Sequence, residues 1–360
     1  MKKLLVLLIM IAASLLLWRQ FSQAPPVLVA SIAQMTSRGM VGSSETNASE
    51  LFLEEHPHSR VQILKVYEEC KPEETASLIQ KAMAQGVRFF ITTHPSKCAL
   101  ASSHLFAGSR ALTINTASTS PALTGKDDFL LRIVPDATQE QRAIARYVNR
   151  MPGHRILVLQ DTSNLPYTDP AFAAFSAELD ALGQWRIVHR KLLVSEFRPD
   201  DYREIMAQPF DALYILAGTF QIAIANIAQL FHYIHPDVPI LLTPWARSPE
   251  VLETAGDAIE RIILPSQYPS RRQNPALEAF FEKFRSRFGY EAHVQIVGVE
   301  QALELLDDAF AKGYDTPERV KEYLLSGATH QTSLGPITFD RNGDVNGDFH
   351  FIQNLRQELE

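Results

Sequence analysis

Short apolar runs rich in β-branched residues alternate with amphipathic stretches along most of this chain. Such alternation is typical of strand–helix–strand units that build a parallel sheet. In the first part of the chain the pattern predicts strands at 27–33, 61–67, 87–92, 111–114 and 129–134, and helices at 43–55, 72–84 and 97–107. Pro72 fits the first turn of its helix, where a missing N–H costs no hydrogen bond, and Glu73 and Glu74 suit the helix dipole there.

The same alternation begins again after Pro135, which predicts a second domain of the same construction. There we expect helices at 138–151, 169–182, 201–207 and 221–233, and strands at 155–160, 185–193, 212–216, 239–243 and 259–264. The fold class that follows is α/β, with two successive doubly wound parallel sheets.

The last part of the chain is predicted to return to helices and to end in a β-hairpin. The expected helices are 275–288, 293–312 and 317–325, and the expected hairpin strands are 337–339 and 349–352. Asn342-Gly343 and Asn346-Gly347 between these strands are turn pairs that can adopt positive φ.

The N-terminus carries an export signal. Lys2 and Lys3 precede an apolar run over residues 4–18, and positive charges before such a run remain in the cytoplasm. Two outcomes for residues 1–24 remain open, namely a signal peptide that is removed and an uncleaved membrane anchor. The only small-residue site near the end of the run is followed directly by Pro25, which should hinder cleavage.

Chain length and net charge restrict the number of domains and the class of partner. About 335 residues follow the export signal, which is enough for two domains with separate cores. The net charge is −7, and no basic stripe is present, so a nucleic-acid partner is not expected. The two cysteines, Cys70 and Cys98, are even in number in an exported chain and can form a disulfide, the alternative being two buried thiols.

Motifs for enzymatic or metal chemistry are missing from the sequence. Neither half carries a glycine-rich phosphate loop, which argues against a nucleotide enzyme. His94 lies close to Cys98, but no acid that would orient the histidine accompanies them, so we expect no enzyme activity and no cofactor. The segment 340–351 begins like a calcium loop, but Val345 stands at the glycine position and Phe351 at the glutamate position, so no metal site is expected.

A loop of small hydroxylated residues is the best candidate for a ligand site. Thr116, Ser118, Thr119 and Ser120 follow the strand 111–114, at the end of a parallel strand where open α/β sheets bind ligands. A solvated connector has the same composition, so both interpretations remain open at this point.

Several segments together resemble one protein family. These are YEEC around Cys70, the loop TASTSPALT followed by FLLRIVPD, a tyrosine in the first loop of the second half, and the terminal GPITFDRNGDV. In this order they resemble the leucine/isoleucine/valine-type periplasmic binding proteins. These proteins are type I solute receptors of ABC importers and are related to the ligand domains of glutamate receptors. The resemblance extends from residue 27 to about residue 353.

The resemblance implies two lobes joined by three crossings, with a ligand cleft between them. The first lobe would comprise 27–135 and 266–334, and the second 136–265 and 335–360. Closure of the lobes on a small-molecule solute would be a hinge motion that binding stabilises. The implied location is the periplasm, with residues 4–18 as the segment that could anchor the protein to the inner membrane. The implied partner is an ABC permease, and the alternative is a membrane-anchored sensor of the same fold.

The resemblance also implies ligand-binding residues. The family holds the carboxylate of an amino acid with residues that match Ser96, the backbone of Ala117, and Thr119. Hydroxyl and N–H groups at strand ends and helix N-termini can bind a carboxylate without a full positive charge. Ser96 could equally serve as a helix N-cap. Tyr167 and Phe220 match the aromatic positions of the second lobe, where packing is the alternative role.

The position that usually carries an acid for the ligand's ammonium is uncharged here. In LLTPWARSPE this place falls at Thr243, Pro244 or Trp245. Burying an ammonium without a partner costs several kcal/mol, so we expect simple amino acids to bind poorly. An amide, a hydroxy acid or an aromatic acid is favoured instead, with Trp245 against a flat group. Asp161 is the candidate replacement for the missing acid, but a cap or turn role is preferred for it.

For the cysteines, the resemblance matches Cys70 to a family cysteine. The partner position of the family falls at Pro95, three residues before Cys98. A disulfide between Cys70 and Cys98 therefore requires the start of the helix after Pro95 to turn Cys98 toward the second strand.

Overall fold

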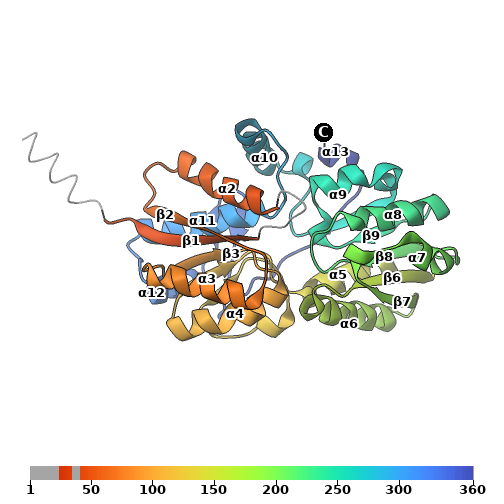
Figure 1. Ribbon diagram of the computed structural model, residues 1–360, viewed down its shortest axis with the longest axis horizontal. Coiled ribbons are helices and arrows are strands. Elements are labelled where there is room, and N and C mark those ends of the chain that lie inside the picture. The colour runs from red at the N-terminus through yellow and green to blue at the C-terminus, as the bar shows by residue number, and fades with distance from the viewer. Residues whose placement is uncertain (1–23, 35–40, 360) are drawn as a thin grey trace, which may run out of the picture.

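The structure is a computed structural model that describes residues 24–34 and 41–359, and it forms two α/β lobes side by side (Figure 1). The predicted export signal lies, apart from Ala24, outside the described residues. None of the helices in these ranges combines the length and the apolar character that a membrane crossing requires.

The first lobe contains a parallel sheet of five strands in the order β2-β1-β3-β4-β5. Its strands are β1 (Val27–Gln34), β2 (Val61–Glu68), β3 (Phe89–Thr92), β4 (Leu112–Asn115) and β5 (Leu130–Arg132). Because side chains alternate along a strand, Phe89 and Ile91 enter the core on one face while Phe90 enters the core on the other.

Helices cover both faces of this sheet. The larger core lies under α2 (Val41–Glu55), α10 (Pro275–Phe288), α11 (Ile296–Ala311) and α12 (Pro317–Leu324). The smaller core lies under α3 (Pro72–Ala84) and α4 (Ser96–Ser109). The last three helices of the larger core come from the C-terminal third of the chain, so the first lobe is assembled from two distant segments (Figure 1).

The second lobe contains a six-stranded sheet in the order β13-β10-β9-β8-β6-β7. Its strands are β6 (Arg155–Asp161), β7 (Arg186–Leu192), β8 (Ala212–Leu216), β9 (Ile240–Leu242), β10 (Ile262–Ser266) and β13 (His350–Ile352). The strands run parallel, except that β13 pairs antiparallel with β10.

The helices of the second lobe also lie on both faces. One core is shared with α5 (Ala137–Asn149) and α6 (Leu165–Leu182), and the other with α7 (Pro199–Met206), α8 (Ala223–Ile234) and α9 (Pro249–Thr254). The chain ends with α13 (Arg356–Leu359) on this lobe (Figure 1). Short 3₁₀ helices occur at Pro121–Leu123, Val194–Glu196, Pro244–Ala246, Gly256–Arg261 and Arg271–Gln273. The predicted fold class, two doubly wound parallel sheets, is confirmed.

The chain passes between the two sheets three times. The passages lie between β5 and α5, between β10 and α10, and between β12 (Gly335–Ile337) and β13. The lobe boundaries that we assigned stay a prediction. Within the range 335–360, Ile337, Phe339 and Val345 pack into the large core of the first lobe, and Ile352 packs into the second lobe.

The predicted terminal hairpin is wrong. Strand β12 pairs with β11 (His330–Thr332), while β13 joins the edge of the second sheet beside β10. Only a single bridge between Phe339 and Val345 remains around the predicted Asn342-Gly343 turn. Gly343 does adopt positive φ there, but the chain then crosses to the other lobe, where the free edge of β10 supplies a longer ladder.

Candidate ligand-binding cleft

The cleft forms where the two sheets present their topological switch points to each other. In the first sheet β1 lies between β2 and β3, and in the second sheet β6 lies between β7 and β8. Open α/β sheets bind ligands beside such points, at the carboxyl ends of the strands. A space here called the front compartment is lined by residues that follow these strands in both lobes, including Thr93, Ser96, Asn164, Gly218 and Phe220.

A second space, here called the hinge-side compartment, lies beside the passages between the lobes. Its lining includes Pro135, Gln267 and Phe349, one residue from each passage. Trp245 and Gln295 line both compartments, so the two spaces adjoin. A solute between the lobes could therefore extend from one compartment into the other.

The structure brings most of the predicted site residues to the cleft. Ser96, Ala117, Tyr167, Phe220 and Trp245 line the front compartment. Their role in binding a ligand stays a prediction.

Two predicted site residues do not line the front compartment. Thr119 lines the hinge-side compartment of the cleft. Thr243 lines neither compartment, and its part in ligand binding stays a prediction. It is fully buried, and its hydroxyl donates to the Ala217 carbonyl at 3.3 Å inside the second lobe.

The hydroxyl-rich loop after β4 is organised by Asn115. Its side-chain Oδ1 accepts hydrogen bonds from the backbone N–H groups of Ala117 and Ser118, at 3.0 and 2.6 Å. The Ala117 N–H is thus already engaged by the protein. The Ser96 hydroxyl accepts from the Ser120 N–H at 3.1 Å, which leaves its own proton available for a further acceptor. Of these two groups, the Ser96 hydroxyl keeps a free donor and the Ala117 N–H does not.

Arg132 of the FLLRIVPD segment also holds this loop in place. Its guanidinium, only 1% exposed, donates to the carbonyls of Ser118 and Ser120 and to the Thr124 hydroxyl, at 3.3, 3.0 and 2.6 Å. It also forms an ion pair with Asp344, which lies on the turn before the third passage. The planar fork of arginine suits several acceptors at once, which explains why this residue accompanies the loop.

Glu45 is an acid of the front compartment that the sequence interpretation missed. It lies on α2, is 1% exposed, and its Oε2 accepts from the Gln34 N–H at 3.1 Å and from the Thr93 hydroxyl at 2.8 Å. Burial raises the pKa of this carboxyl to about 8, against the opposing effect of the two hydrogen bonds.

Glu140 is the corresponding acid of the hinge-side compartment. It lies on α5, and its Oε1 accepts from the Tyr167 hydroxyl at 2.6 Å and from the Gln141 amide at 2.7 Å. Burial raises the pKa of Glu140 to about 7. Burial, together with the neighbouring Glu140, raises the pKa of Tyr167 well above its ordinary value, so the phenol remains a donor.

Aromatic residues form the walls that the two lobes present to each other. Tyr167 packs edge-to-face with Trp245, with ring centroids 6.0 Å apart. Phe220 packs edge-to-face with His293 of the first lobe, with centroids 4.7 Å apart. His293 in turn contacts Glu250 of the second lobe, with Nε2 and Oε2 2.9 Å apart. The described conformation is therefore one in which the lobes touch on the cleft side.

Asp161 lines neither compartment, which favours a structural role for it. It is fully buried, and its carboxylate accepts from the backbone N–H groups of Ser163, Val194 and Gly218, at 3.2, 3.1 and 3.0 Å. The Gln221 amide adds a further bond at 3.3 Å. Such saturation identifies Asp161 as the residue that shapes the loop after β6, as in the preferred interpretation.

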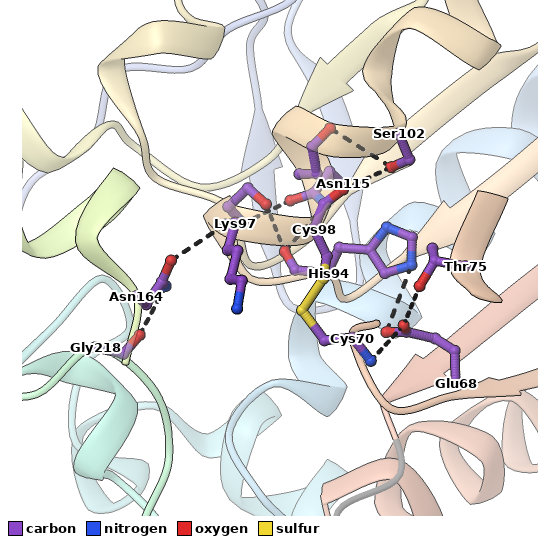
Figure 2. The surroundings of a disulfide bond; sticks show 12 residues. Glu68, Cys70, Thr75, His94, Lys97, Cys98, Ser102, Asn115, Asn164 and Gly218 are labelled. Carbon is purple, nitrogen blue, oxygen red and sulfur yellow. Dashed lines mark hydrogen bonds and ion pairs between the residues drawn. A yellow bond between two sulfur atoms is a disulfide. The ribbon is translucent and has the colours of Figure 1, made fainter. Parts of the chain in front are cut away.

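The disulfide holds the start of α4, two residues after Ser96 of the front compartment. Cys70, at the end of β2, is bonded to Cys98, near the start of α4 (Figure 2). Beside it, Nε2 of the fully buried His94 lies 3.6 Å from Oε1 of Glu68. Burial lowers the pKa of His94, and Glu68 opposes this effect. Because the Cys98 sulfur is bonded, it is not a thiol that His94 could activate.

No metal-binding arrangement is visible in residues 24–34 and 41–359: they contain no group of three or more His, Cys, Asp or Glu side chains that could hold an ion. In the segment that begins like a calcium loop, Asp340 Oδ1 accepts from the backbone of Asn342 and Asp344, and Asp344 binds Arg132. These carboxylates are engaged in the turn itself.

Comparisons with known proteins give a family. A family profile described as periplasmic binding protein matches residues 34–356. No protein of curated function matches the sequence.

Several solved structures have the same fold. A solute binding protein of an ABC transporter from Rhodopseudomonas palustris BisB5, in complex with 3,4-dihydroxybenzoic acid, superposes with a TM-score of 0.81 at 18% identity, covering 91% of this chain and 93% of that chain. A leucine binding protein from Thermotoga maritima MSB8 gives 0.77 at 22% identity, with 91% and 99% covered. An R. palustris solute binding protein in complex with benzoate gives 0.78 at 17% identity, with 91% and 92% covered. At these identities the likeness shows the fold alone.

Proposed function

The chain belongs to the periplasmic binding protein family, and from this premise we propose that it binds a small solute outside the cytoplasm and delivers it to an ABC importer. Delivery would depend on closure of the two lobes around the solute, a hinge motion whose closed state binding stabilises. The ABC permease would be its partner.

One observation carries this proposal above the others. The front compartment is built from the strand ends of both sheets at their switch points, so that each lobe supplies one wall. A site divided in this way is complete only when the lobes are closed, which couples occupancy to the shape that a permease would recognise. Ser96 and Ala117 would contribute from the first lobe, and Tyr167, Phe220 and Trp245 from the second.

The walls of the front compartment support a solute with a flat or apolar part, because Tyr167, Phe220 and Trp245 line it. Two proteins of the same fold are in complex with 3,4-dihydroxybenzoic acid and benzoate, and one is named a leucine binding protein, so solutes of these kinds are the first to test.

A binding role, and not an enzymatic one, fits the groups around the cleft. The only Cys and His that are close in sequence are Cys98, which is bonded to Cys70, and His94, which contacts Glu68. Neither residue is thereby presented to a solute as a nucleophile or a base.

The folded part would lie in the periplasm, in keeping with the family. Retention of the apolar run 4–18 would in addition anchor the protein to the inner membrane. This run favours a second candidate function, a tethered receptor that senses the solute and passes the signal to a membrane protein. Mass spectrometry of the mature N-terminus, with fractionation of membrane and periplasm, decides between removal and retention of residues 1–24.

The test of the main proposal measures solute-driven closure. The full chain would be screened by thermal shift against amino acids, amides and aromatic acids, because a ligand at a hundred times its Kd stabilises a protein by about 2.7 kcal/mol. Each hit would then be added during small-angle X-ray scattering. A decrease in the radius of gyration supports the proposal. Hits that leave the radius unchanged, or no hit in a screen extended to periplasmic metabolite extracts, would contradict it.

A further inference from the structure

The hinge-side compartment contains buried polar atoms that the protein leaves without hydrogen bonds. Within the described residues these are Oγ1 of Thr116, Oγ1 of Thr119 and Oε1 of Gln295. Nε1 of Trp245 has no well-aligned hydrogen bond either, although it interacts with the Tyr167 hydroxyl. Leaving a buried polar atom unpaired costs about 1–3 kcal/mol, so several around one space are a sign of a missing partner. Two hydroxyls and an indole N–H can donate, and the amide oxygen accepts.

The Glu140 carboxyl of this compartment uses only one of its two oxygens for hydrogen bonds. Both hydrogen bonds of the Glu140 carboxyl, from Tyr167 and Gln141, end on Oε1. Its other oxygen therefore remains for a group inside the compartment. Because burial raises the pKa of Glu140 to about 7, this carboxyl is able to hold a proton near neutral pH and to donate it in a hydrogen bond.

The charges of the lining restrict what can bind. Neither compartment is lined by a Lys, Arg or His among the described residues, whereas each is lined by one buried acid, Glu45 or Glu140. A carboxylate placed beside Glu140 would be buried without a cation, which is costly. The remaining surface is flat and mainly apolar, being formed by Pro135, Pro244, Trp245, Tyr268 and Phe349.

We propose that the hinge-side compartment is a second part of the solute site, and that it takes an uncharged planar group that both donates and accepts hydrogen bonds, such as a phenol or a primary amide. The inference rests on the proposed function, since the solute would reach this space from the front compartment past Trp245 and Gln295. Thr119 and Glu140 are its specificity-determining residues. The solute is accordingly neutral at this end.

The experiment uses four small probes on the full chain: phenol and benzamide as neutral groups, benzoate as an anion and benzylamine as a cation. Calorimetry at neutral pH is expected to show the neutral probes binding at least about tenfold more tightly than the charged ones, because burying an unpaired charge costs more than 1.4 kcal/mol. Tighter binding of benzoate or benzylamine, or no binding of either neutral probe, would overturn the proposal.

Variants of the lining residues, compared with a matched control, test whether the probes bind in the hinge-side compartment. Thr119→Val should weaken phenol binding about three- to tenfold through loss of one hydrogen bond. Thr113→Val is the control, because the Thr113 hydroxyl is equally buried and unpaired but lies in strand β4 and lines neither compartment. Glu140→Gln removes the ionisable acid, so benzoate should gain at least about threefold in affinity. Equal effects of the two threonine variants, or unchanged benzoate affinity in Glu140→Gln, would contradict the proposal.

Failure of this inference is distinguishable from failure of the proposed function. If a solute closes the lobes and its affinity falls in Phe220→Ala but not in Thr119→Val, the protein binds solutes in the front compartment alone. If no solute closes the lobes, the proposed function itself fails.

Discussion

The Asn164 side chain accepts a hydrogen bond from the backbone N–H of Lys97 at 3.1 Å and thereby joins the two lobes (Figure 2). Asn164 precedes α6 of the second lobe, and Lys97 lies in the first turn of α4, where backbone N–H groups have no partner within the helix. The amide of Asn164 also donates to the Gly218 carbonyl at 2.8 Å, which fixes its orientation. Because this contact spans the cleft, we expect it to break when the lobes open.

Asn164→Ala should therefore weaken solute binding. Loss of the bond to Lys97 removes about 1 kcal/mol from the closed state, which corresponds to about a fivefold lower affinity. Calorimetry with a solute found in the screen measures this change. Asn149→Ala, at the far end of α5, is the control and should bind as the parent does. Equal affinity of parent and Asn164→Ala would show that the contact does not stabilise closure.

Asp161→Asn is expected to lower stability and to leave the charge preference of the site unchanged. The carboxylate accepts hydrogen bonds from three backbone N–H groups. The side-chain NH₂ of an asparagine would point at one or more of these N–H groups, so that two donors would face each other. A loss of about 1–3 kcal/mol in the free energy of unfolding should appear in urea titrations. An unchanged unfolding curve together with a selective loss of amine binding would contradict this prediction. It would indicate that Asp161 binds the ammonium group of a ligand.

The fold was largely predictable from the sequence because strand and helix patterns are local. The strands from Val27 to Ser266 follow apolar runs whose alternation is visible in the residues themselves. The ending was predicted incorrectly for the opposite reason. The segments around Ile337 and Phe351 look like two halves of a hairpin, but each has a partner far away in the sequence, β11 for the one and β10 for the other.

Cys70 and Cys98 should resist alkylation in unreduced, denatured protein, because the structure joins them. Replacing both with Ala should lower the free energy of unfolding by about 2–4 kcal/mol, since the bridge closes a loop of 28 residues. Reducing agent should produce the same loss in the parent and none in the double variant. Alkylation of both residues in the unreduced parent would exclude the bond.

The buried Glu45 should make the protein less stable at alkaline pH. Its pKa is about 8 in the folded state and near 4.5 when unfolded, so between these values the folded state binds more protons than the unfolded state. The free energy of unfolding then falls as pH rises from about 5 to about 9, by on the order of a few kcal/mol at most. Glu45→Gln should flatten this slope. The control Glu253→Gln, at an exposed position, should leave the slope unchanged. Parallel pH profiles of parent and Glu45→Gln would contradict the prediction.

The acids of the cleft were missed because each lies on a helix that first appears to serve packing only. On α5 the buried positions include Ala137, Ile144 and Val148, and Glu140 and Gln141 occupy the same face. A carboxyl on the apolar face of an amphipathic helix was the available signal, and Glu45 repeats it on α2. Which space such a residue faces depends on how the lobes meet, and no local pattern contains that information.

The split composition of the first lobe has a consequence for biosynthesis. Its large core joins residues 29–133 to residues 277–345, whereas most of the core of the second lobe comes from the continuous stretch 137–264. During translocation the first sheet thus emerges with one apolar face uncovered until α10, α11 and α12 have followed. The second lobe, although it is synthesised later, is able to close most of its core sooner. Until these helices pack on the first sheet, its uncovered apolar face is prone to aggregation. Periplasmic chaperones are most needed during this interval.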